Sequence, residues 1–207
     1  MNNTGNNIYK SGASDEKKVL PPLKLRNIWG HFKTVSLHRF RVCRNCFKMG
    51  LYWQGLTHDL SKFSPTEFLR GCRFYQGVRS PNAKEREIFG YSSAWLHHKG
   101  RNRHHYEYWI DFSSMDSNQP FGVLPGRMPD KYIAEMIADR VAASRTYKGD
   151  SYTSAAPLEY YNRVRQTPVP MHPYTQEKLE LFLHMLAEKG EDYTFSYIKH
   201  DFLHKHF

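Results

Sequence analysis

An imidazole and a carboxylate on consecutive residues, His58 and Asp59, offer two metal ligands of different hardness. On a helix, neighbouring side chains point about 100° apart, so both reach one ion only if it lies in the angle between them. The dipeptide alone indicates little. It gains meaning because isolated histidines precede it, a histidine cluster follows it, and an aspartate in a small-residue helix comes later.

That later aspartate is Asp139, and helical spacing places it on one face with Tyr132, Met136 and Ala143. A buried, unpaired carboxylate is expensive, and a metal ion or another cation removes most of the penalty. The neighbouring alanines leave room for a second helix or an ion. Taken alone, an ion pair with an arginine or a partly exposed surface acid is the simpler interpretation.

A candidate first ligand precedes the pair. His31, Val35, His38 and Val42 recur at spacings of four, three and four, which puts them on one helix face. His31 competes with His38 for the role, and His38 is preferred here. Alone, His38 would be interpreted as a core histidine with satisfied hydrogen bonds.

Taken together, these residues supply two imidazoles and two carboxylates from separate helices: His38, His58, Asp59 and Asp139. This mixed nitrogen and oxygen set suits Mn²⁺, Fe, Co, Ni or Zn and is less suited to Ca²⁺. The sequence therefore predicts a site for a divalent transition metal.

The pattern resembles the HD-domain metal-dependent phosphohydrolase superfamily, whose signature is His…His-Asp…Asp on an all-α scaffold. Residues 57–62 and 136–140 are similar to its two acidic segments, and His38 lies twelve residues before the helix-ending Gly50. The resemblance covers about residues 25–145. The interval from His38 to His58 is short for the superfamily, so the turn at Gly50 must be tight.

Over most of its length the chain is also similar to a group of uncharacterised bacterial proteins, largely from anaerobic Firmicutes and their phages. Residues 55–62 and 95–105 carry this resemblance. It implies family membership and adds nothing about a substrate.

Four histidines lie within nine residues: His97, His98, His104 and His105. Two-metal members of the superfamily add histidines between the His-Asp pair and the last aspartate, which is where these four fall. The resemblance thus implies a second ion bridged by Asp59, with His98 and His104 as the leading pair and His97 and His105 as alternatives. A histidine-rich surface loop, or packing against neighbouring aromatic rings, is the other interpretation.

The net charge of +10 favours a phosphate-bearing partner or, equally, a solvated basic surface. Lys62, four residues after His58, is expected to face the same way on a helix and to hold a phosphate. Guanidinium forks suit phosphate oxygens, so nearby arginines are expected to clamp it. The residues expected to bind the phosphate are Lys62, Lys99, Arg101 and Arg103, and Arg140 also lies beside the motifs.

The sequence thus predicts a metal-dependent hydrolase, a phosphomonoesterase or phosphodiesterase, that acts on a nucleotide or another phosphate ester through metal-activated water. Asp59, His104 and His105 are the candidate catalytic residues, because a histidine that binds no metal can protonate the leaving group. One or two divalent ions are expected. The alternatives are a di-iron oxygenase on the same scaffold and a non-enzymatic nucleotide-binding or nucleic-acid-binding protein, the latter favoured by charge and abundant Tyr and Trp.

The elements that must position these residues are expected to be helices. The predicted fold class is all-α, an HD-domain-like helical bundle. Residues 1–20 are expected to form a flexible polar tail and residues 21–207 a single domain, with the metal-site core at about 25–145 and further helices in 153–207. Ser64 and Glu67 are expected to form a capping box, and residues 111–128 a long loop that serves as a lid or part of a site. The expected helices are 25–48, 51–62, 64–75, 83–89, 92–99, 130–145, 153–165, 175–189 and 193–202.

No apolar run approaches the length of a membrane span, and residues 1–18 lack the apolar core of a signal peptide. We therefore expect a cytoplasmic protein with no membrane partner. The three cysteines agree with this location. Cys43 and Cys46 form a single C-x-x-C within a helical run, which favours small residues near a buried face over a redox or zinc site.

Overall fold

The structure is a computed structural model that describes residues 19–113, 122–164 and 169–204. Most of the expected tail, residues 1–18, lies outside these ranges. The described part is mostly helical, which confirms the all-α prediction. Its helices are α1 (Leu25–Lys48), α2 (Tyr52–Thr57), α3 (Pro65–Phe74), α4 (Pro81–Phe89), α5 (Ser93–Lys99), α6 (Asp130–Lys148), α7 (Ala156–Val164) and α8 (Pro173–Tyr197).

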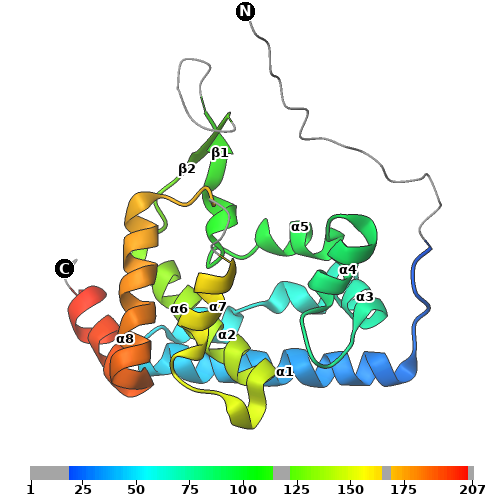
Figure 1. The fold of residues 1–207 in the computed structure, drawn as a ribbon, viewed down its shortest axis with the longest axis horizontal. Helices are drawn as coiled ribbons and strands as arrows, with labels where there is room; N and C mark the ends of the chain where they lie inside the picture. The colour runs from blue at the N-terminus through cyan, green and yellow to red at the C-terminus, as the bar shows by residue number, and fades with distance from the viewer. Residues whose placement is uncertain (1–18, 114–121, 165–168, 205–207) are drawn as a thin grey trace, which may run out of the picture.

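The long helix α1 organises the fold (Figure 1). Helices α3, α4 and α5 pack together beside its N-terminal half, and α6, α7 and α8 pack together beside its other half. The histidine and aspartate motifs lie where the two groups of helices meet. Among the described residues, no helix is long and apolar enough to cross a membrane.

Helix α6 packs closely on α1 because its contact face is built from alanine. Ala134, Ala138 and Ala142 are fully buried, so the two backbones can approach each other. Asn45 of α1 donates a side-chain hydrogen bond to the Ala138 carbonyl at 3.2 Å. This close contact fixes the register of the two helices, and therefore the distance between the acidic residues of α6 and the histidine face of α1.

The predicted single helix over 51–62 is wrong. Helix α2 ends at Thr57, and Asp59 adopts a left-handed backbone (φ 53°) before a short 3-10 helix at Leu60–Phe63. Arg39 of α1 explains the break, because its Nε donates to the His58 carbonyl at 2.7 Å and thereby takes an acceptor from any continuing helix. The His-Asp pair thus lies in a turn rather than along a helix.

The turn before α2 agrees with the sequence. Gly50 adopts a φ of 78°, and the chain reverses within three residues between α1 and α2. The cysteine interpretation also holds, because Cys46 is buried, Cys43 is half-buried, and both thiols are free on α1.

Part of the predicted loop 111–128 is wrong. Ile110–Phe112 (β1) and Val123–Pro125 (β2) form a small antiparallel hairpin, with Ile110 opposite Pro125. β-branched and aromatic residues in β1 favour extended backbone, and the run is too short to show alternation in the sequence. Residues 114–121 lie outside the described ranges, and the lid role stays a prediction.

The C-terminal helices meet at a break rather than a loop. Gly190 has a φ of 81° and a ψ of 178°, so the segment Pro173–Tyr197 is interrupted there, as the closing glycine of 175–189 predicts. Beyond it the chain continues helically into a π-type turn, Ile198–Phe202. Leu179, Leu183 and Leu186 are fully buried in the core that α8 shares with α6.

Gly71 on α3 leaves room for a buried imidazole. A Cβ at this position would lie 2.1 Å from Nε2 of His31. We expect Gly71→Ala to lower the free energy of unfolding by about 1–3 kcal/mol, as overpacking does, measured by urea denaturation. Gly100→Ala is the matched control, because its Cβ would meet nothing closer than 3.5 Å. Equal effects of the two variants, or strict additivity of Gly71→Ala with His31→Ala, would contradict this packing.

Candidate metal centre

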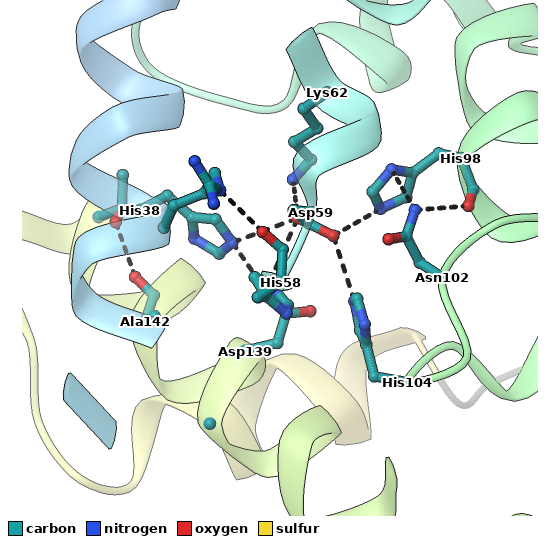
Figure 2. A network of polar contacts seen from close by, with 12 residues as sticks. His38, His58, Asp59, Lys62, His98, Asn102, His104, Asp139 and Ala142 are labelled. Atoms are coloured by element: carbon teal, nitrogen blue, oxygen red, sulfur yellow. Dashed lines mark hydrogen bonds and ion pairs between the residues drawn. The ribbon is translucent and has the colours of Figure 1, made fainter. Parts of the chain in front are cut away.

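The first candidate ligand set converges on one point (Figure 2). Nε2 of His38 lies 3.0 Å from Oδ1 of Asp139 and 3.7 Å from Oδ2 of Asp59. Nε2 of His58 lies 3.3 Å from the same Asp59 oxygen. One ligand atom from each of the four residues falls within 4.8 Å of the others. The predicted convergence of α1, the His-Asp pair and α6 is therefore confirmed.

A second set of potential ligands shares Asp59. Nε2 of His98 and Nε2 of His104 lie 3.3 Å and 3.4 Å from Oδ1 of Asp59. His105 joins this group, and its Nε2 is 2.9 Å from Nε2 of His98. The two carboxylate oxygens of Asp59 thus face different sets of imidazoles, Oδ2 toward the first and Oδ1 toward the second.

The backbone of Asp59 is in an unusual conformation. It is the one non-glycine residue with a positive φ among those described, and its side chain is 1% exposed. The left-handed conformation disfavours residues with a Cβ by about 1–2 kcal/mol, although aspartate tolerates it better than most. Nζ of Lys62 lies 2.7 Å from Oδ2 of Asp59 and supplies charge to the buried carboxylate. A strained, buried acid held in this way is characteristic of a functional site.

Glu135 orients two of the histidines. Nδ1 of His58 donates to Oε1 of Glu135 at 2.8 Å, and Nδ1 of His104 lies 3.2 Å from the same oxygen. With Nδ1 held, Nε2 of each ring faces Asp59. Metal-binding histidines commonly make this kind of bond to a carboxylate. Sequence reasoning missed Glu135, although it lies four residues before Asp139 and so shares its helix face.

Glu67 orients two further histidines, His97 and His98, in the same way. Its Oε2 accepts from Nδ1 of His98 at 2.8 Å and its Oε1 from Nδ1 of His97 at 2.6 Å. The expected capping box is half correct: Oγ of Ser64 accepts from the Glu67 backbone N–H at 3.4 Å, but the Glu67 side chain binds histidines rather than returning to the helix start. His97 accordingly lies outside both ligand sets.

The charges of the cluster compensate each other. Burial disfavours ionisation of Asp59, but the charges of His58, Lys62 and His98 hold its pKa well below the usual range. Burial likewise disfavours the charged form of His58, yet Asp59 and Glu135 raise its pKa to about 10. Metal binding at neutral pH would therefore release a proton from His58, because a ligand nitrogen must be deprotonated.

Several buried atoms of the centre have no hydrogen-bond partner among the described residues. They are Nε2 of His38, Nε2 of His58, both carboxylate oxygens of Asp59, and Nε2 of His104. These atoms lie close to one another, and Oδ2 of Asp59 also has its ion pair with Lys62. Most buried polar atoms in proteins do have a partner, so several lone pairs facing one point fit a bound cation. Imidazole nitrogens with carboxylate oxygens suit a divalent transition metal.

The structure does not bring His31 to either ligand set. Its ring packs against Phe68 and Tyr75. Burial, helped by the charge of Lys62, lowers the pKa of His31 to about 4, so it is neutral at physiological pH. His31 is a core histidine in the wall of the cleft beside the centre.

A cleft of about 740 Å³ opens onto the centre between the α3–α4–α5 group and helices α6 and α7. Six residues of the candidate site line it: His38, Lys62, Glu67, His98, His105 and Asp139. Of the predicted phosphate-binding residues only Lys62 does so. Lys99, Arg101 and Arg103 do not line the cleft, and Arg103 instead donates to the Tyr132 hydroxyl at 3.3 Å.

His104 and His105 were expected to donate a proton to the leaving group, and their surroundings do not favour that role. Nδ1 of His104 faces Glu135, and its Nε2 lies among the candidate ligand atoms beside Oδ1 of Asp59, so His104 is placed to bind a metal rather than to reach a leaving group. His105 lines the cleft, but burial and the neighbouring His104 and His98 hold its pKa well below the usual value. A neutral His105 can bind a metal, but it carries no acidic proton for a leaving group at physiological pH.

The shared carboxylate is the most direct test of the centre. We expect Asp59→Asn to abolish tight binding of divalent ions, because it removes the charge between both sets while asparagine still tolerates a left-handed backbone. Metal content after incubation with Mn²⁺, Co²⁺ or Zn²⁺ and gel filtration, measured by mass spectrometry, checks this. Asp192→Asn, which alters an exposed acid paired with Lys48, is the matched control. Equal metal content in both variants would contradict the assignment.

Glu135 tests the orienting contacts separately. Glu135→Gln keeps the shape but weakens the bonds to His58 and His104, so we expect metal affinity to fall about 10–100-fold. Competition with a chromogenic chelator gives the affinity. Glu87→Gln, a change at an exposed acid paired with Arg79, should leave it unchanged. An unaltered affinity in Glu135→Gln would show that the Glu135 contacts do not support a metal.

Comparisons with known proteins give a family and no relative of established activity. No curated protein matches the sequence, and no solved structure matches it. Residues 27–185 match one family, and this segment contains both candidate ligand sets. The match covers most of the chain, so the chain belongs to the family described as Family of unknown function (DUF5662).

Proposed function

We propose that this protein is a metal-dependent phosphohydrolase that cleaves a phosphate ester through metal-activated water. The observation that carries the proposal is the position of Asp59, whose two oxygens face two separate sets of imidazoles and carboxylates. A carboxylate shared in this way can hold two ions close enough to act together on a phosphate ester.

The order of the residues supports membership of the HD-domain superfamily as part of this proposal. A histidine on α1, a His-Asp pair after α2 and an aspartate on α6 follow the His…His-Asp…Asp signature, and all four converge. The short interval between His38 and His58 is accommodated by the turn at Gly50.

A divalent ion bound here would lower the pKa of a water molecule toward neutrality and polarise a phosphoryl oxygen. The chain contributes the remaining functions. Glu135 and Glu67 hold the histidine rings in place, and Lys62 both steadies Asp59 and presents a positive charge to the cleft. The cleft volume of about 740 Å³ lies within the range of small-molecule sites.

The surroundings of the centre favour a phosphate ester over a neutral substrate. Lysine and arginine residues outnumber carboxylates in the cleft wall, six to four among the described residues. An excess of positive charge raises the local concentration of anionic ligands.

A second candidate is a di-iron oxygenase on the same scaffold. The group of three histidines around Oδ1 of Asp59 favours it, because imidazole-rich sites also bind iron. Consumption of O₂ by the iron-loaded protein, without hydrolysis of any ester, would identify this activity.

We expect the full-length protein loaded with Mn²⁺, Co²⁺, Ni²⁺, Fe²⁺ or Zn²⁺ to hydrolyse nucleotides or simple aryl phosphates. Asp59→Asn and Asp139→Asn should each lower kcat/KM by about 100-fold or more, because metal charge stabilisation is worth several kcal/mol. Asp192→Asn should retain full activity.

Phosphate release and nitrophenol absorbance measure the reaction. Absence of turnover with every ion, or full turnover in Asp59→Asn, would contradict the proposal. Salt-sensitive binding of DNA or RNA that survives both substitutions, without hydrolysis, would instead indicate a nucleic-acid-binding protein.

A further inference from the structure

The cleft above the metal centre carries positive charge that the ligand sets do not use. Three of its six basic residues form ion pairs: Lys62, Arg79 and Lys148. Within the described ranges, the other three have no carboxylate at ion-pair distance: Arg86, Arg140 and Arg163. They come from α4, α6 and α7 and so surround the opening.

Arg140 is the most informative of the three. It follows Asp139 on α6, and its Nε is buried without a hydrogen-bond partner among the described residues. Its guanidinium lies 5.8 Å from the ring of Tyr161. Glu107 is close enough to act on it electrostatically, but the two form no ion pair. A buried guanidinium N–H without a partner is costly, and an anionic ligand in the cleft would reduce that cost.

The other two arginines are held by stacking. The guanidinium of Arg86 lies 5.4 Å from the ring centre of Trp95, and Trp95 packs edge-on against His105 at 4.7 Å. The guanidinium of Arg163 lies 5.3 Å from the ring of Tyr160. A guanidinium stacked on a ring keeps its N–H edges available to an anion. Trp95 also places Arg86 next to the second ligand set.

We propose that these three arginines form an anion subsite, separate from the metal centre, for a second phosphoryl group of the substrate. The inference rests on the proposed function and narrows its substrate to esters with two or more phosphoryl groups, such as nucleoside diphosphates or bisphosphates. The metal ligands serve the phosphoryl group that reacts. The arginines bind the one that does not, because their forks match its oxygens.

Isothermal titration of the full-length protein in the presence of a chelator tests the subsite without turnover. The probes are adenosine monophosphate, adenosine diphosphate and adenosine 3′,5′-bisphosphate. We expect at least one doubly phosphorylated probe to bind about tenfold or more tightly than the monophosphate, as charge-assisted bonds to a second phosphoryl group imply. A preference for the diphosphate indicates adjacent phosphoryl groups, and a preference for the bisphosphate indicates separated ones.

Arg140→Gln should remove this preference, and Arg140→Lys should restore only part of it, because lysine keeps the charge but loses the fork. Arg101→Gln is the matched control, since Arg101 is exposed and does not line the cleft. Arg86→Gln, at the exposed rim, gives the same readout if Arg140→Gln unfolds in a thermal melt.

Equal affinity of the wild-type protein for all three probes, or an equal loss in Arg101→Gln, would overturn the subsite. Failure of the subsite and failure of the proposed function are distinguishable. Metal-dependent hydrolysis of monophosphates without any preference leaves the hydrolase intact and removes the subsite. A preference that depends on Arg140, without hydrolysis under any ion, supports the subsite and removes the hydrolase.

Discussion

The arrangement of the site depends on one buried carboxylate, Asp59. Its two oxygens lie between two sets of imidazoles, and its charge holds the surrounding groups in their ionisation states. Two structural features make this position available. Helix α2 ends at Thr57, where Arg39 binds the carbonyl of the next residue, His58, and the left-handed backbone of Asp59 then turns its side chain into the space between the two groups of helices.

Around Asp59 the fold holds several of the candidate ligands in place. Alanines on α6 let that helix approach α1, which brings Asp139 within 3.0 Å of His38. Glu135 and Glu67 each hold imidazole rings from a second layer. Such support matters because metal affinity depends on ligand atoms that are already in place before the ion binds.

The sequence predicted much of this arrangement, for identifiable reasons. Helix α1 and the histidine face on it followed from helical spacing, which is local information. The convergence of His38 with Asp139 was expected from their complementary ligand types and from the family resemblance, not from spacing. The break after Thr57 did not, because it depends on Arg39, a contact made across the tertiary structure. Lys62 was therefore expected to align with His58 and instead contacts Asp59.

The roles of Glu67 and Glu135 also depend on tertiary contacts that the sequence does not show. Glu67 satisfied the local pattern of a helix cap, and nothing in its neighbourhood indicated the histidines thirty residues later that it binds.

Arg101 and Arg103 lie beside the histidines in sequence, yet the loop carries them away from the cleft. Arg86 and Arg163, remote in sequence, line it because α4 packs on α3 and α7 packs on α6 at its border.

The central claim is that Asp59 holds metal between two ligand sets. Anomalous scattering from crystals of the full-length protein grown with Mn²⁺ tests it most directly. The account predicts a peak within bonding distance of Oδ2 of Asp59 and Nε2 of His58, with a second ion, where present, at Oδ1 beside His98 and His104. A protein whose crystals show no peak at Asp59, or a peak bound only by other residues, would contradict it.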